Sequence, residues 1–111
     1  MVNNVEKLKL KNHPYSNCYV LKDFEDEKIV AVHFISYTTE VITAVKSENY
    51  WLVKCHGTFS QTTAKQIGYF LKEYFPELNY YDMKNSFKKN EVISYEGKSF
   101  TWNIPEKTKI F

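Results

Sequence analysis

The chain has 111 residues, of which 43% are hydrophobic and 25% charged, a composition typical of one globular domain that is large enough to bury its own core. All 15 basic residues are lysine, which argues against base-specific reading of duplex DNA, because that reading relies mainly on arginine. The net charge is only +2, which is too small to indicate duplex DNA binding and also argues against a strongly acidic mimic of DNA. No apolar run is long enough for a membrane span and the first ten residues are charged rather than signal-like, so we expect an intracellular protein.

The first half of the chain is predicted to form consecutive strands. Residues 1–14 carry little pattern, although Val5, Leu8 and Leu10 suit an initial strand or a loose arm. We expect strands at 15–24, 29–37, 41–46 and 50–55, where β-branched and aromatic residues are separated by polar turns. The segment 29–37 is apolar on both faces, which favours a central strand. This order predicts an antiparallel meander.

The segment 60–75, SQTTAKQIGYFLKEYF, has the clearest helical period in the chain, and Pro76 is expected to end the helix. Hydroxyl residues at its start suit capping, with Thr63 and Gln66 at capping-box spacing, and free N–H groups there also suit a bound anion. Gly68 costs about 1 kcal/mol relative to alanine in a helix, so we expect it to allow close approach to a sheet. The expected buried stripe leaves out Tyr69 and Phe70 and comprises Ala64, Ile67, Gly68, Leu71, Tyr74 and Phe75.

A second helix and a hairpin are predicted after Pro76. Tyr80, Met83 and Phe87 recur at i, i+3 and i+7, which indicates a short helix at 80–90 with these residues on its buried side. Segments 91–95 and 98–103 flank the turn Glu96-Gly97 and suit a hairpin, followed by a frayed tail at 105–111. Residues 1–111 are therefore expected to form a single α+β domain: an antiparallel β-meander packed against one main amphipathic helix, with a second short helix and a C-terminal β-hairpin.

Few side chains favour catalysis or metal binding. Cys18 and Cys55 lack the spacing of a disulfide framework or a zinc site, so we expect both to be reduced and partly buried. A Cys–His pair built from Cys55 and a histidine is the alternative, but Cys55 and His56 are neighbours in a strand and should point to opposite faces. His13, His33 and His56 show no local spacing for a metal. We expect no catalytic residues, no metal site and no cofactor.

Aromatic residues make up 17% of the chain, more than one buried stripe requires. The simplest explanation is an aromatic-rich core, whereas exposed rings beside lysines can anchor a protein interface or stack on single-stranded bases. The missing arginine and the small net charge favour a protein partner. Expected partner-binding residues lie on the outer face of the main helix, on the strand at 50–54 and on the C-terminal helix: Tyr50, Trp51, Lys65, Tyr69, Lys72, Lys84, Lys88 and Lys89.

Two segments within residues 34–73 form a specific pattern: SYTTEVI at 36–42, followed by FSQTTAKQIGYFL at 59–71. They resemble a family of small proteins carried by phages and other mobile elements of Gram-positive bacteria, with the pattern S-Y-x-T-x-V-A and then Y-S-x-T-T-x-x-H-I-x-x-F-L. Gln66 replaces the family's histidine and Phe59 its first tyrosine, so no role of that histidine is carried over. The resemblance implies a small protein that binds a host protein, and inhibitors of CRISPR-Cas nucleases are one prominent kind.

Together these observations predict a non-catalytic, stoichiometric inhibitor from a phage or mobile element, acting in the cytoplasm of a bacterial host. The expected partner is a host protein. The specific case is a Cas9-type nuclease or its guide-RNA complex, for which the chain would be an anti-CRISPR protein. The alternative is a single-stranded nucleic-acid-binding module of the same element, using lysines and tyrosines on the sheet. A small enzyme built on Cys55 and a histidine is the least favoured hypothesis.

Overall fold

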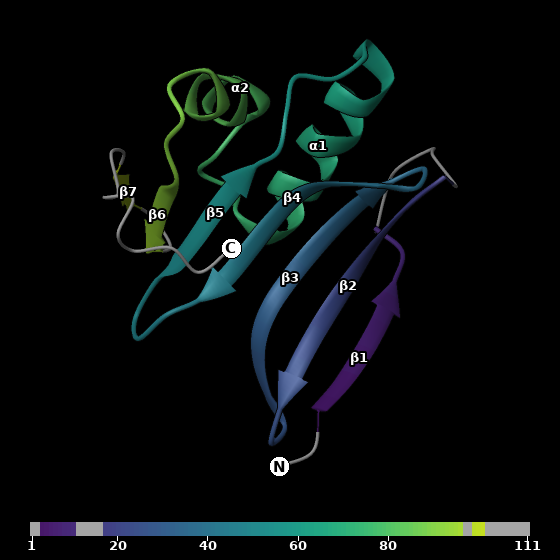
Figure 1. Ribbon diagram of the computed structural model, residues 1–111, viewed down its shortest axis with the longest axis vertical. Helices are drawn as coiled ribbons and strands as arrows, with labels where there is room; N and C mark the ends of the chain where they lie inside the picture. The colour runs from purple at the N-terminus through teal and green to yellow at the C-terminus, as the bar shows by residue number, and fades with distance from the viewer. Residues whose placement is uncertain (1–2, 11–16, 97–98, 102–111) are drawn as a thin grey trace.

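The computed structural model describes residues 3–10, 17–96 and 99–101. They form one antiparallel sheet whose strands pair in sequence order, with two helices inserted between β5 and β6 (Figure 1). The predicted α+β meander is therefore confirmed. The strands are β1 (Asn3–Leu8), β2 (Cys18–Glu25), β3 (Lys28–Ser36), β4 (Thr39–Lys46), β5 (Trp51–Cys55), β6 (Ile93–Glu96) and β7 (Ser99–Thr101), and the helices are α1 (Gln61–Tyr74) and α2 (Tyr80–Lys88).

Short turns account for the central part of the meander, from β2 to β4. Asp26 and Glu27 have φ of 51° and 68°, and left-handed geometry at both central residues is the mark of a two-residue hairpin turn that matches strand twist. Tyr37, with φ of 58°, begins the equally short connection from β3 to β4. The predicted turn glycine Gly97 and the frayed tail at 105–111 lie outside the described residues, as do parts of the predicted first strand and final hairpin.

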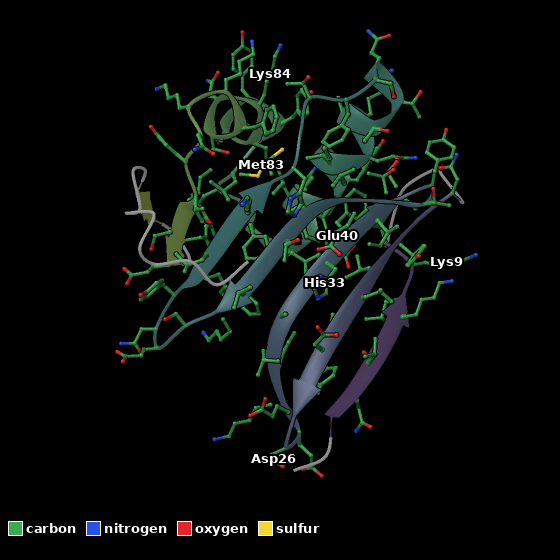
Figure 2. All side chains as sticks on the ribbon, in the orientation of Figure 1. Lys9, Asp26, His33, Glu40, Met83 and Lys84 are labelled. Carbon is green, nitrogen blue, oxygen red and sulfur yellow. The ribbon has the colours of Figure 1, made fainter. Side chains whose placement is uncertain are left out.

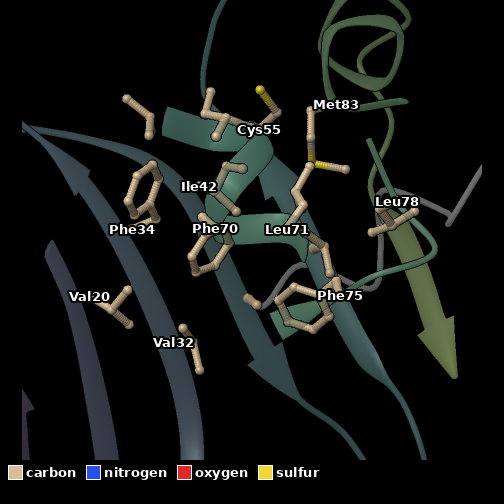
Figure 3. Packing of buried hydrophobic residues seen from close by; sticks show 14 of the residues in the cluster. Val20, Val32, Phe34, Ile42, Cys55, Phe70, Leu71, Phe75, Leu78 and Met83 are labelled. Atoms are coloured by element: carbon tan, nitrogen blue, oxygen red, sulfur yellow. The ribbon is translucent and has the colours of Figure 1, made fainter. Parts of the chain in front are cut away.

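Both helices pack on the same face of the sheet, because their buried side chains join one cluster with those of β2 to β6. Phe70 is central to that cluster: it is 0% exposed and stacks on Phe34 of β3 with ring centroids 4.7 Å apart (Figure 3). The prediction that Phe70 lies off the buried face of α1 is therefore wrong. The buried residues of α1 are Thr63, Gln66, Ile67, Phe70 and Leu71, a stripe rotated from the expected one.

Buried polar side chains explain this rotation of α1. The Ser36 hydroxyl on β3 donates to Gln66 Oε1 at 2.6 Å and lies 3.1 Å from Thr63 Oγ1, while Gln66 Nε2 donates to Asn17 Oδ1 at 2.6 Å. Satisfied in this way, Thr63 and Gln66 can face the core at little cost. The expected Thr63–Gln66 capping box is absent, since Ser60 is the N-cap and accepts from the Thr63 N–H at 3.3 Å.

The expected close approach of Gly68 to the sheet is also wrong. A Cβ added at Gly68 meets no atom within 4 Å, because the rotation of α1 moves this position to the edge of the packed side. The predicted end of the helix before Pro76 is confirmed, with α1 stopping at Tyr74 and Phe75 as its C-cap. Neither helix in the described part of the chain is long and apolar enough to cross a lipid bilayer.

α2 buries Met83 and Ser86, and Tyr80 packs against the core from its flank. Phe87, predicted to be buried, is 42% exposed. The reason is again a rotation of the helix: the Ser86 hydroxyl donates to the Met83 carbonyl at 2.8 Å, so this serine can occupy the inner side and Phe87 moves outward.

Candidate functional site

α2 turns two aromatic rings and several lysines away from the sheet. Tyr81 is 70% exposed, and Lys84 and Lys88 follow it at i+3 and i+7, so the three share one side of the helix. Figure 2 shows Lys84 pointing outward from α2 and Met83 pointing toward the sheet. Phe87 lies beside this row, on the flank next to Lys84. We call the following group the α2 surface: Tyr81, Lys84, Phe87, Lys88 and Lys89.

Local sequence fixes the position of the α2 surface. The Asn79 side chain accepts from the Asp82 N–H at 3.0 Å, and the Asp82 carboxylate accepts from the Asn79 N–H at 2.9 Å, a complete capping box. At the other end Asn90 has φ of 55°, the left-handed conformation that commonly terminates helices. Lys88 and Lys89 lie at this C-terminal end, where the helix dipole favours positive charge. The α2 surface is therefore rigid and basic.

The other predicted partner-binding residues lie on two further surfaces. Lys65, Tyr69 and Lys72 are exposed along one stripe of α1, with Tyr69 37% exposed as its single ring. Trp51 at the start of β5 is half-buried and meets the Phe75 ring edge-on at a centroid distance of 5.9 Å. Tyr50 beside it is also half-buried, and in Figure 1 the start of β5 lies away from α2. The structure thus gathers Lys84, Lys88 and Lys89 with two exposed rings, but separates them from the other predicted residues.

A second polar group crosses the sheet on the face opposite α1. His33 of β3 has its Nε2 2.8 Å from Asp23 Oδ2 and its Nδ1 2.8 Å from Glu40 Oε2. The Thr43 hydroxyl donates a short hydrogen bond to the same Glu40 oxygen, and Thr43 Oγ1 lies 2.7 Å from His56 Nε2. We call Asp23, His33, Glu40, Thr43 and His56 the five-residue network.

A β-bulge brings Glu40 into the five-residue network. Phe34 pairs with Ile42, but the next residue, Ile35, pairs with Glu40, so Val41 is an extra residue in β4. Strict alternation places Glu40 on the same face as Ile42, toward the helices. The bulge moves Glu40 to the face of His33 instead.

The charges of the five-residue network follow from these contacts. Burial alone disfavours the imidazolium of His33, but hydrogen bonds and charges from Glu40 and Asp23 outweigh it and raise its pKa above the ordinary 6.5. Burial likewise favours the neutral form of Glu40, but the bonds from His33 and Thr43 prevail and lower its pKa. Burial lowers the pKa of His56. A His33 ring with both nitrogens donating to carboxylates has no lone pair with which to accept a proton.

Cys55 is paired with neither of the two described histidines, His33 and His56. Its thiol donates to the Gly57 carbonyl at 3.2 Å within the core, whereas His56 contacts Thr43 on the other face, as alternation predicted. Burial raises the pKa values of the Cys18 and Cys55 thiols, which keeps both protonated. Both are free, as predicted, and they are fully buried rather than partly buried. Among residues 3–10, 17–96 and 99–101, no three or more histidines, cysteines and acids are grouped so that they could hold a metal ion.

Sequence reasoning missed Tyr81, Phe87 and the five-residue network. Tyr81 follows directly after Tyr80, so assigning Tyr80 to the buried side was already a signal that Tyr81 faces outward. The pairing of His33 with Thr43 depends on the bulge in β4, so regular strand alternation gave no signal for the network. Comparison of the chain with protein-family models, with curated proteins and with solved protein structures found no match. The geometry of the α2 surface and the resemblance over residues 34–73 are therefore the two grounds for a function.

Proposed function

We propose that this chain is a non-catalytic inhibitor, encoded by a phage or mobile element, that acts in the cytoplasm of a bacterial host by covering a surface of a host protein. In its most specific form the proposal is an anti-CRISPR protein that blocks a Cas9-type nuclease, alone or as its guide-RNA complex. The single observation that carries the proposal is the α2 surface, where Tyr81 and Phe87 are exposed beside three lysines.

The α2 surface has the chemistry of an interface anchor. Aromatic side chains dominate the binding energy of many interfaces, and Tyr81 offers its ring and hydroxyl without a buried partner to give up. Lys84 and Lys88 favour an acidic partner and speed its approach through electrostatic steering. Because the capping box and buried Met83 hold α2 in place, binding requires little ordering of the backbone.

The resemblance over residues 34–73 supplies the biological side of the proposal. Proteins of phages and mobile elements commonly act on host proteins, and a rigid binder of 111 residues needs no active site to do so. The lysines of the α2 surface suit a partner with acidic or phosphate groups, and a nuclease holding its guide RNA offers both.

The test is a cleavage assay with a Cas9-type nuclease and its guide RNA, titrated with the full chain. We expect inhibition that saturates at about one chain per nuclease complex, as stoichiometric binding requires. Tyr81→Ala is expected to weaken inhibition about thirtyfold, the effect of losing an interface hot spot. The double variant Lys84→Glu, Lys88→Glu is expected to abolish inhibition. The matched control is the double variant Lys65→Glu, Lys72→Glu on α1, which changes the net charge by the same amount.

A second titration separates the protein partner from the nucleic-acid alternative. Rings beside lysines also stack on single-stranded bases, and such binding weakens steeply with salt because each contacted phosphate releases counterions. The nucleic-acid alternative is favoured if the chain binds a mixed single-stranded oligonucleotide with micromolar affinity, and if that affinity is lost both at physiological salt and in Tyr81→Ala. Absence of nuclease inhibition at tenfold molar excess overturns the anti-CRISPR proposal.

A further inference from the structure

β1 forms one edge of the sheet and pairs with β2 along all six of its residues, from Asn3 opposite Glu25 to Leu8 opposite Val20. No other strand in the described part of the chain pairs with its outer side. The outward backbone groups of an edge strand are a ready template for a further strand. Residues 4–7 are all exposed, and Val5, at 65%, is among the most exposed large apolar side chains described.

The usual protections against edge pairing are weak in β1. The strand holds no proline, and its register against β2 shows no bulge. Lysine is the common guard of an edge strand, but the Lys7 ammonium lies 4.2 Å from the centre of the Tyr19 ring on β2. Lys7 is thus held back over its own sheet by a cation–π contact.

Geometry restricts how β1 can pair with a second copy of itself. In a symmetric antiparallel pair the two-fold axis is perpendicular to the sheet, and opposed side chains must lie on the same face. Because side chains alternate between the two faces along a strand, the axis must lie between the two copies of one residue, which then faces itself. An axis at Glu6 or at Lys7 sets a charge opposite its own copy, and an axis at Leu8 sets Lys7 opposite Lys9, so all three are unfavourable.

An axis at Val5 avoids these repulsions. It sets Val5 against Val5 and Asn4 against Glu6, so one apolar pair is flanked by two polar pairs without like charges. Beside Val5 the surface is hollowed by about 310 Å³, with Phe24 and Val30 in the lining, which leaves room for a side chain from the second copy. We propose that two copies of this chain associate through β1, centred on Val5, and join their sheets into one continuous antiparallel sheet.

The proposal is tested by sedimentation velocity of the full chain over a concentration series. A single short strand pair buries little area, so we expect a reversible dimer with a dissociation constant on the order of 10 µM. Val5→Lys sets two lysines against each other at the axis and is expected to raise that constant at least about tenfold. Thr39→Lys, at an exposed position of β4, is the matched control and is expected to leave it unchanged.

Disulfide trapping tests the register. Val5→Cys is expected to cross-link two copies under mild oxidation, because residues on the axis face each other within disulfide reach. Lys7→Cys is expected not to, because two such residues are about 14 Å apart in this register, at roughly 3.4 Å per residue. The native Cys18 and Cys55 are buried and do not compete. The proposal is overturned if the chain is monomeric at every concentration up to about 1 mM. It is also overturned by a dimer that persists in Val5→Lys, or by cross-linking of Lys7→Cys rather than Val5→Cys.

Discussion

At the scale of single residues, His33 makes the stability of this sheet depend on pH. Folding raises the pKa of His33, so its ion pairs stabilise the fold fully below pH 6.5 and fade as the pH rises through the folded value. Folding lowers the pKa of Glu40, so its contribution is full above pH 4.5 and fades as the pH falls. Both contributions are complete only between these two values.

His33→Gln is therefore expected to lower the free energy of unfolding most between pH 4.5 and 6.5, the window in which both groups are charged. Because Asp23 and Glu40 are both more than a third exposed, water screens the pairs and the expected loss is only about 1 kcal/mol. Urea denaturation at several pH values measures it.

His56→Gln is the control for this prediction, with the opposite trend. Folding lowers the pKa of His56, so its protonation on acidification favours the unfolded chain. Replacing His56 removes that penalty, and the variant is expected to gain stability relative to the natural chain as the pH falls below 6.5. A loss at His33→Gln that is the same at pH 5.5 and pH 9 contradicts the assigned charge on His33.

Gly68 is another position where one residue has a measurable consequence. It lies within α1, and a Cβ there meets open space, so Gly68→Ala is expected to stabilise the protein by about 0.5–1 kcal/mol through helix propensity. Chemical denaturation measures the gain. Gly57→Ala is the comparison, because its Cβ meets the Phe59 ring at 3.2 Å and no such gain is expected. A loss of stability in Gly68→Ala contradicts the packing described for α1.

At the scale of elements, the sequence predicted where strands and helices lie but not how the helices are rotated. Turn residues and hydrophobic periods locate the elements, and α1 begins and ends within a residue of the predicted segment. A count of apolar residues assigns the polar Gln66 to the exposed side of α1. Gln66 is nevertheless fully buried, because Ser36 and Asn17 form hydrogen bonds with its side-chain amide. Ser36 comes from a distant strand, so the partner that decides the rotation is invisible locally.

The same scale governs α2, which at nine residues is too short to be stable by itself and depends on its cap. Asn79→Ala removes the capping box and is expected to cost about 1 kcal/mol of the free energy of unfolding. Asn79→Asp keeps the acceptor for the Asp82 N–H and is expected to retain most of the stability. Equal losses in the two variants contradict the role assigned to the cap.

At the scale of the whole molecule, the central part of the meander follows from chain order, because short turns leave β2, β3 and β4 their neighbours as partners, whereas β6 pairs with β5 across the two inserted helices. The face on which a residue ends up is less predictable. One extra residue in β4 moves Glu40 across the sheet to His33, and no periodic pattern encodes that bulge. The α2 surface was predicted only through its lysines, because the exposed Phe87 fits the helical period of a core residue.

We propose that the α2 surface is where this protein binds its partner. Amide hydrogen exchange of the full chain, free and with an excess of the nuclease–guide complex, tests it most directly. We expect slower exchange on binding for the amides of residues 80–89, with residues 65–72 of α1 unchanged. Slower exchange confined to α1 or to β5, or no difference anywhere in the chain, contradicts the claim.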